Sequence, residues 1–270
     1  MNFFTYRIKD LPEKMPSSFE ETLRNQGLPG EAVFLGSQIL DHFVWKHSDL
    51  NIYPAGGKTI ELSETKDHFF FLNCNGSVPE IIKKREGIQA VLKKKSDGCS
   101  LIRFVKKNLE HFNISASSMI SSFKVTSSFR KKEVSFENGM FVTGPKVWQR
   151  VYINRKKFSG IYREAVSAHP VGDRGKQLSV TVPAVSFPVE KIFFEGGISD
   201  SGRFSGGAPV SVAVFQNDKN MKIEVEDKWK KKELRGFSSD APIEIVIKSE
   251  KSGKRHFHFD VIYLVENPYG

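Results

Sequence analysis

Short strand-like runs fill the chain from residue 115 onward, and they constrain the fold more than any other feature of the sequence. Within each run apolar residues alternate with polar ones or form a short apolar stretch, and Gly or Pro separates most runs from the next. Many short strands at this spacing favour an antiparallel β-sandwich or barrel. The runs cover residues 123–129, 133–142, 146–154, 178–187, 191–195, 209–216, 221–227, 243–248 and 256–265.

The first 114 residues mix element types. Ser77–Glu80 reads as a capping box, and the apolar residues after it recur at roughly helical spacing, which predicts a helix over about 77–95. A second helix is predicted over about 100–112. We therefore expect an α+β, predominantly β protein, in which both helices pack against the sandwich or barrel. Residues 1–114 would form a mixed α/β region and residues 115–270 an antiparallel β domain, unless the two form one continuous domain.

The positive charge is concentrated in one segment. The formal net charge is +10, yet residues 1–102 hold 13 basic and 13 acidic side chains, and residues 164–270 hold 15 of each. Residues 103–163 hold 13 basic and 3 acidic side chains. Such a segment predicts a one-sided field that attracts polyanions.

Basic triplets lie between aromatic and β-branched residues in this segment, in FRKKEVSF (129–136) and WQRVYINRKKFSGIY (148–162). Cations that neutralise phosphates and aromatic rings that stack on bases are what a single-stranded nucleic-acid surface uses. Strand alternation that turns the rings inward and the lysines outward would give only a solvated sheet face. The candidate phosphate-binding residues are Arg130, Lys131, Lys132, Arg150, Arg155, Lys156 and Lys157, and the candidate stacking residues are Trp148 and Tyr152.

These features favour a non-catalytic protein that binds single-stranded nucleic acid, with RNA preferred as the partner. The residues assign no reaction and imply no cofactor, so an enzyme is not the favoured interpretation. One alternative is a viral-type structural or transport protein that self-assembles into a homo-oligomer and contacts a genome.

Another alternative is a magnesium-dependent nuclease. Glu224 and Glu226 would share one face of a strand, with Asp200 or Asp218 as a third ligand. Alternating Lys and Glu on an exposed strand produces the same pattern without any catalytic role.

His256, His258 and Asp260 alternate with phenylalanines, so on a strand they share one face and could hold zinc, iron or manganese. The competing interpretation is the solvent face of a terminal strand. Cys74 and Cys99 are too few for a disulfide framework and are expected to be small core residues.

The amino terminus is charged by position 7 and has no apolar run before a cleavage site, so it does not resemble a secretory signal. No apolar run approaches the length of a transmembrane helix. We therefore expect a soluble, intracellular, cytoplasmic protein without a transmembrane segment.

Overall fold

The computed structural model describes residues 16–26, 31–36, 52–53, 67–74, 87–146, 148–170, 176–203, 209–225, 227–250 and 256–267. The chain divides into two compact units. Unit 1 comprises Met1–Phe112 with Asn267–Gly270, and unit 2 comprises Asn113–Glu266. The domain boundary predicted after residue 114 stays a prediction, because compactness alone does not test independent folding.

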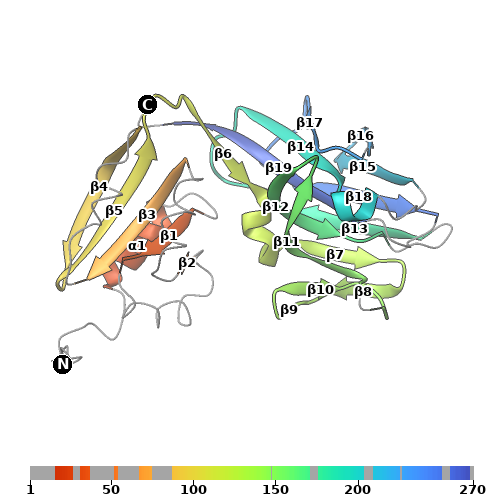
Figure 1. The fold of residues 1–270 in the computed structure, drawn as a ribbon, viewed down its shortest axis with the longest axis horizontal. Coiled ribbons are helices and arrows are strands. Elements are labelled where there is room, and N and C mark those ends of the chain that lie inside the picture. The colour runs from red at the N-terminus through yellow and green to blue at the C-terminus, as the bar shows by residue number, and fades with distance from the viewer. Residues whose placement is uncertain are drawn as a thin grey trace. The chain divides into compact units, whose positions relative to one another are not determined.

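The described residues of unit 1 form one helix and a five-stranded sheet of order β2-β1-β3-β5-β4 (Figure 1). β1 is parallel to both β2 and β3, whereas β5 is antiparallel to both β3 and β4. The elements are α1 (Ser17–Gln26), β1 (Ala32–Leu35), β2 (Ile52–Tyr53), β3 (His68–Cys74), β4 (Ile88–Ser96) and β5 (Cys99–Lys106).

β3 lies at the centre of unit 1 and is buried along its whole length. Because successive side chains of a strand point to opposite faces, its phenylalanines and leucine supply both apolar layers. Phe70 and Leu72 belong to the cluster that includes Phe19 of α1. Phe69 and Phe71 pack in a second cluster with other residues of the sheet. A strand buried on both faces explains why this segment is continuously apolar rather than alternating.

The two helices predicted over 77–95 and 100–112 are wrong where the structure describes them. Residues 88–96 form β4 and residues 99–106 form β5, while residues 75–86 lie outside the described residues. Asp97 and Gly98 both have positive φ, at 49° and 71°, so they form the tight turn of a β-hairpin rather than a helix stop. β5 is buried on both faces, and an apolar run of that kind has no period that separates strand from helix.

The structure also corrects the expectation that Cys74 and Cys99 are separate core residues, because they form a disulfide. They face each other at the ends of β3 and β5, in the register that pairs His68 with Val105 at the opposite ends of the strands. The bond therefore ties the last residue of one strand to the first residue of its neighbour.

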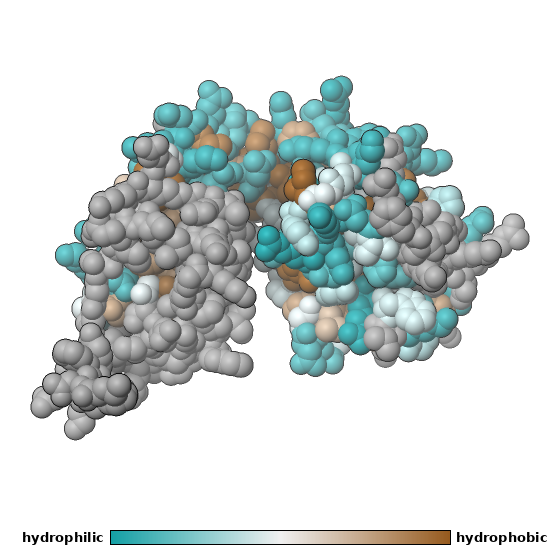
Figure 2. All heavy atoms as spheres, in the orientation of Figure 1, coloured by the Kyte–Doolittle hydropathy of each residue, from teal (hydrophilic) through white to brown (hydrophobic). Residues whose placement is uncertain are grey.

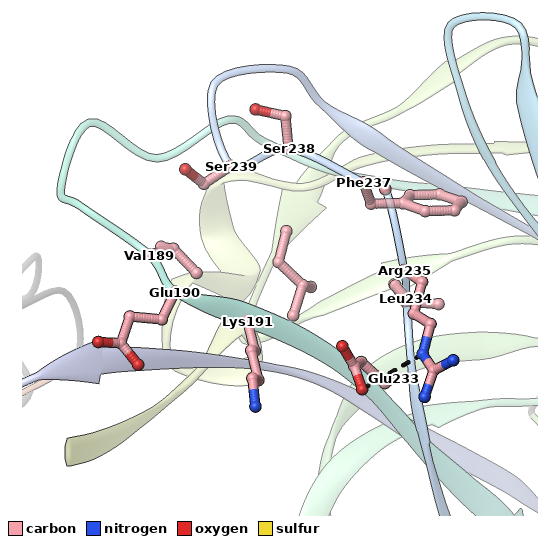
Figure 3. Close-up of a pocket in the computed structure, with 11 residues that line it drawn as sticks. Val189, Glu190, Lys191, Glu233, Leu234, Arg235, Phe237, Ser238 and Ser239 are labelled. Atoms are coloured by element: carbon pink, nitrogen blue, oxygen red, sulfur yellow. Dashed lines mark ion pairs between the residues drawn. The ribbon is translucent and has the colours of Figure 1, made fainter. Parts of the chain in front are cut away.

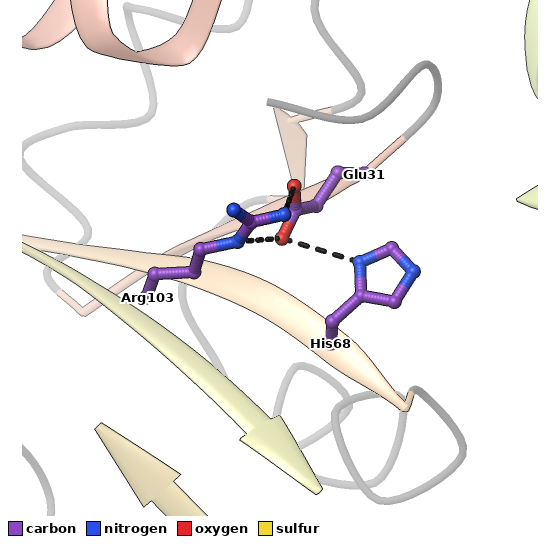
Figure 4. A network of polar contacts seen from close by, with 3 residues as sticks. All are labelled: Glu31, His68 and Arg103. Carbon is purple, nitrogen blue, oxygen red and sulfur yellow. Dashed lines mark hydrogen bonds and ion pairs between the residues drawn. The ribbon is translucent and has the colours of Figure 1, made fainter. Parts of the chain in front are cut away.

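A buried ion pair joins Glu31, immediately before β1, to Arg103 of β5 (Figure 4). Arg103 donates from Nε to Glu31 Oε1 and from Nη2 to Oε2, both at 2.8 Å. His68 Nδ1 lies 3.2 Å from the same Oε1. The Arg103 guanidinium also lies 5.2 Å from the ring centre of Phe70. Two parallel charge-assisted hydrogen bonds offset part of the cost of burying both charges.

Unit 2 contains two antiparallel sheets. The eight-stranded sheet follows the order β17-β14-β19-β12-β11-β10-β9, with β6 paired to β19 beside this path, and the six-stranded sheet follows β16-β15-β18-β13-β7-β8. The elements are β6 (His111–Ser115), η3 (Ala116–Ser122, a 3-10 helix), β7 (Lys124–Ser127), β8 (Arg130–Val134), β9 (Phe136–Glu137), β10 (Met140–Val142), β11 (Arg150–Phe158), β12 (Ile161–Ala168), β13 (Gln177–Val182), β14 (Lys191–Ile198), α5 (Asp200–Arg203), β15 (Val210–Gln216), β16 (Lys219–Glu224), β17 (Lys230–Glu233), β18 (Ile243–Ser249) and β19 (Phe257–Glu266).

The predicted fold class is confirmed: the protein is predominantly antiparallel β, and the two sheets of unit 2 are the layers of a β-sandwich. Tight turns join consecutive strands of the eight-stranded sheet. Asn138 and Gly139 join β9 to β10, and Ser159 and Gly160 join β11 to β12, all with positive φ. This turn geometry matches the right-handed twist of the flanking strands. No helix among the described residues is both long and apolar enough to span a membrane.

Candidate functional site

The two basic triplets do not belong to one sheet. Arg130–Lys132 lies on β8, at one edge of the six-stranded sheet, whereas Arg155–Lys157 lies on β11 of the eight-stranded sheet. The side chains of the first triplet lie outside the described residues. Of the two candidate stacking residues, Trp148 is exposed and Tyr152 is half-buried, whereas Phe158, next to the second triplet, is buried. The two triplets therefore do not form one continuous basic surface on a single sheet.

The second triplet is itself divided by strand alternation. Arg155 and Lys157 are exposed, and both lie over the ring of Tyr162 on β12, with charge-to-ring distances of 5.5 and 5.7 Å. Lys156 points to the other face of β11, is half-buried, and lowers the pKa values of His256 and His258 through its charge.

A pocket of about 330 Å³ opens on the same face as Lys156. Its lining comes from β10, β11 and β12 and from the residue before β19. The strand register places Met140 opposite Tyr152, and Tyr152 opposite Ser167, so these side chains form one row across three strands. The described lining residues are Met140, Trp148, Arg150, Tyr152, Ser167, His169 and His256.

Trp148 is the large exposed ring at this pocket, with 48% of its surface accessible. The segment between β10 and β11 holds it in place through Gln149, which is buried. The Gln149 carbonyl oxygen accepts from the Thr143 backbone N–H at 2.8 Å, and Gln149 Oε1 accepts from the Lys146 backbone N–H at 3.0 Å. Lys146 Nζ lies 5.2 Å from the centre of the Trp148 ring. The indole is thus about half exposed, and the Lys146 ammonium group lies over its ring.

Gly144 lies where this segment leaves no room for a side chain. A Cβ there would come within 2.3 Å of Gln149 Oε1. We expect Gly144→Ala to displace Gln149 and with it Trp148, so that ligand binding at the pocket weakens about threefold to tenfold while the fold is kept. Titration of the protein with a ligand, followed by tryptophan fluorescence, measures this change in affinity. Gly160→Ala is the control, since a Cβ at Gly160 meets nothing within 4 Å and the β11–β12 turn contributes no lining residue to the pocket, although its positive φ will cost some stability.

Arg150 and Tyr152 supply hydrogen-bond donors to the pocket. Arg150 is half-buried, and its Nε is shielded from solvent and has no hydrogen-bond partner among the described residues. The Tyr152 hydroxyl oxygen accepts a hydrogen bond from Asn154 Nδ2 at 3.2 Å, so its own O–H can donate to a ligand. Ser167 contributes a hydroxyl that can donate or accept.

His169 and His256 form the far wall, with ring centres 5.9 Å apart and their planes nearly perpendicular. Burial lowers the pKa of both imidazoles. The nearby His256 adds to this effect on His169, and the charge of Lys156 adds to it on His256. Both rings are therefore neutral at neutral pH. His169 Nδ1 lies 3.1 Å from the Pro170 carbonyl oxygen, which can only accept, so Nδ1 carries the proton and Nε2 is left as an acceptor.

His258 and Asp260 do not lie on a solvent face, and that interpretation is wrong. β19 is an interior strand of its sheet, and both side chains are buried. Burial lowers the pKa of His258 to about 4. Burial raises the pKa of Asp260 to about 7, although it accepts from the Ser115 hydroxyl and from the backbone N–H groups of Ser117 and Val261. These contacts make Asp260 an anchor for the start of η3.

The described residues that were predicted to bind a metal do not come together as a set of ligands. Among the described residues no three His, Cys, Asp or Glu side chains group as metal ligands. Asp200 instead accepts hydrogen bonds from the backbone N–H groups of Ser159 and Gly160, at 2.8 and 3.2 Å, and so fixes the β11–β12 turn. Glu224 is exposed at the end of β16 in the other sheet, and Glu226 lies outside the described residues.

A second pocket of about 210 Å³ lies in unit 2 between residues 189–192 and 233–239 (Figure 3). Glu233 and Arg235 form an ion pair of 3.6 Å within it. Figure 3 labels one aromatic residue there, Phe237, and it is half-buried. This pocket lacks the exposed ring that distinguishes the first one.

The described surface on the face drawn in Figure 2 is largely hydrophilic, with separate apolar spots. The large apolar side chains exposed in the described part of the chain are Val142, Trp148, Ile161 and Tyr162. Sequence reasoning named Trp148, Arg150, Tyr152 and His256 separately and missed Met140, Ser167 and His169 as their neighbours. Their shared face on adjacent strands is visible only once the register is known.

No protein-family model matches the chain, and no curated protein matches its sequence. Solved structures with a similar fold include the CBM51-2 and INT domains of Clostridium perfringens ZmpB, in complex with GlcNAc. The TM-score is 0.36 at 10% identity, over 68% of this chain and 42% of that one. The CBM51 module of a GH95 protein from Clostridium perfringens, in complex with methyl-galactose, gives 0.33 at 11% identity, over 56% and 99%. The mannan-recognising module TmCBM27 gives 0.31 at 10% identity, over 59% and 99%.

The prediction of single-stranded nucleic-acid binding is therefore wrong. The two basic triplets lie on different sheets, strand alternation divides the second triplet between the two faces of β11, and Phe158 beside it is buried. The viral-type structural role and the magnesium nuclease also required nucleic acid, as a partner or as a substrate, and these two alternatives are wrong as well.

Proposed function

We propose that unit 2 binds carbohydrate in the pocket beside Trp148. The observation that carries the proposal is the position of a half-exposed indole, fixed by its own loop, at the edge of a pocket lined by hydrogen-bonding side chains. The proposal rests on this geometry, and the similarity to the solved structures lends it no weight.

A sugar ring presents two kinds of surface, and the pocket offers a match for each. The C–H groups of a pyranose form an apolar face that packs on an aromatic ring, and the hydroxyl groups at its edge need hydrogen-bond partners. Trp148 supplies the flat apolar surface, and Tyr152, Ser167 and His169 supply polar groups around it. A volume near 330 Å³ lies at the lower end of the roughly 300–1,000 Å³ range of ligand pockets and suits one or two sugar rings.

The proposal is tested by binding to a panel of methyl glycosides and short oligosaccharides, followed by titration of each ligand found. Trp148→Ala is expected to weaken binding about 10- to 50-fold, because covering about 60–90 Å² of indole surface is worth about 25 cal/mol per Å². Isothermal titration calorimetry gives the affinities directly.

Tyr162→Ala is the matched control, because Tyr162 is a more exposed ring on the same sheet and does not line the pocket. It should leave the affinity unchanged. Equal affinities for the parent chain and Trp148→Ala would exclude this pocket, and absence of binding to every carbohydrate in the panel would exclude the function.

A further inference from the structure

We infer that the pocket takes an acidic saccharide, one that carries a carboxylate or sulfate group, and that Arg150 pairs with that group. This inference rests on the proposed function and narrows it to a class of ligand. Three observations support it: the donors and acceptors of the pocket wall, the unpaired Nε of Arg150, and the charged side chains next to the pocket.

The described wall has more donors than acceptors. Arg150 can only donate through its five N–H groups, and the Tyr152 oxygen already accepts from Asn154 and keeps its O–H to donate. The acceptors are the Ser167 hydroxyl and one ring nitrogen each of His169 and His256, and no Asp or Glu is among the described lining residues. Hydroxyl groups of a neutral sugar donate as readily as they accept, so a site for such a sugar needs acceptors to receive those protons. A carboxylate or sulfate adds acceptor oxygens and no donor, which fits a wall of this kind.

Arg150 is the lining residue with a permanent charge. His169 and His256 are neutral at neutral pH because burial lowers the pKa of each. Arg150 Nε is hidden from solvent without a hydrogen-bond partner among the described residues, and leaving a buried donor unpaired is unfavourable. An anionic oxygen in the pocket would supply the missing acceptor.

Two lysines and one carboxylate lie next to the pocket, and the carboxylate is that of exposed Glu137, opposite Met140. Lys146 lies over the Trp148 ring, and Lys156, half-buried on the pocket face of β11, is close enough to act on His256 and His258. The second pocket of unit 2 differs, because carboxylates of Glu190 and Glu233 line it (Figure 3). A positive field at the first pocket favours an anionic ligand over its neutral counterpart of the same shape.

The test compares sugars that differ in one group: methyl glycosides of galactose and glucose, their uronic acid counterparts, and their 6-sulfates. We expect at least one acidic sugar to bind about tenfold or more tightly than its neutral partner, with an affinity that falls between 50 and 300 mM salt. Arg150→Gln should remove this preference, so that the acidic sugar and its neutral partner bind the variant with affinities within about threefold of each other. Arg150→Lys should keep part of it, since it retains the charge and loses the planar fork.

Arg155→Gln is the matched control, because it removes an equal charge from the same strand at an exposed site away from the pocket. It should not alter the preference. Equal binding of neutral and acidic sugars, or an acid preference that survives in Arg150→Gln, would overturn this inference and leave the proposed function standing. Failure of every sugar to bind would reject the proposed function and this inference together.

Discussion

Replacing Glu31 by Gln is expected to lower the free energy of unfolding of unit 1 by about 3–5 kcal/mol. The Arg103 guanidinium would keep its charge in a site where only 3% of its surface is accessible, and its carboxylate partner would be gone. Chemical denaturation followed by circular dichroism measures the loss. A change below about 1 kcal/mol would show that the pair is not buried in solution.

Two further variants separate the pair from other effects of substitution. Glu31→Leu combined with Arg103→Met removes both charges, and because it leaves no unpaired ion it should recover most of the stability lost by Glu31→Gln. Glu20→Gln breaks the pair between Glu20 and Arg24 of α1, whose side chains are 34% and 45% exposed. Exposed pairs of this kind contribute little, so we expect a change within about 0.5 kcal/mol.

Loss of the Cys74–Cys99 disulfide is expected to lower the stability of unit 1 by about 3.5 kcal/mol, on the loop-entropy model for a closed loop of about 25 residues. The two cysteines are 25 positions apart, and the bond restricts that loop in the unfolded chain. Denaturation with and without a reducing agent measures the effect. Cys74→Ala combined with Cys99→Ala should unfold at the same denaturant concentration in both conditions.

An unchanged denaturation midpoint on reduction of the parent chain would contradict this prediction. The state of the two cysteines also bears on localisation, which stays a prediction. Disulfides persist in oxidising compartments and are rare in the cytosol. Free thiols at Cys74 and Cys99 in protein taken from its own cells would support the cytoplasmic localisation predicted from the sequence, and a bonded pair would oppose it.

The strand predictions succeeded where a run is half-buried and bounded by turn residues. The predicted run 209–216 corresponds to β15 and 243–248 to β18, because their alternating residues face the core on one side only. The predictions failed in β5, whose apolar residues face cores on both sides and therefore resemble part of a helix. They also started β11 too early, because the strand begins at Arg150 and Trp148 lies before it.

The sequence alone determined the class of fold and named several residues of the pocket singly, because period, turn residues and composition are local properties of a chain. It could not determine which strands are neighbours. Ser167 lies opposite His258, about ninety residues away in the chain, and the pocket exists because β10, β11, β12 and the start of β19 meet in that register. Pairing of distant strands depends on how whole faces bury one another, so only the tertiary structure separated the basic triplets and joined Trp148, Arg150 and His169 in one site.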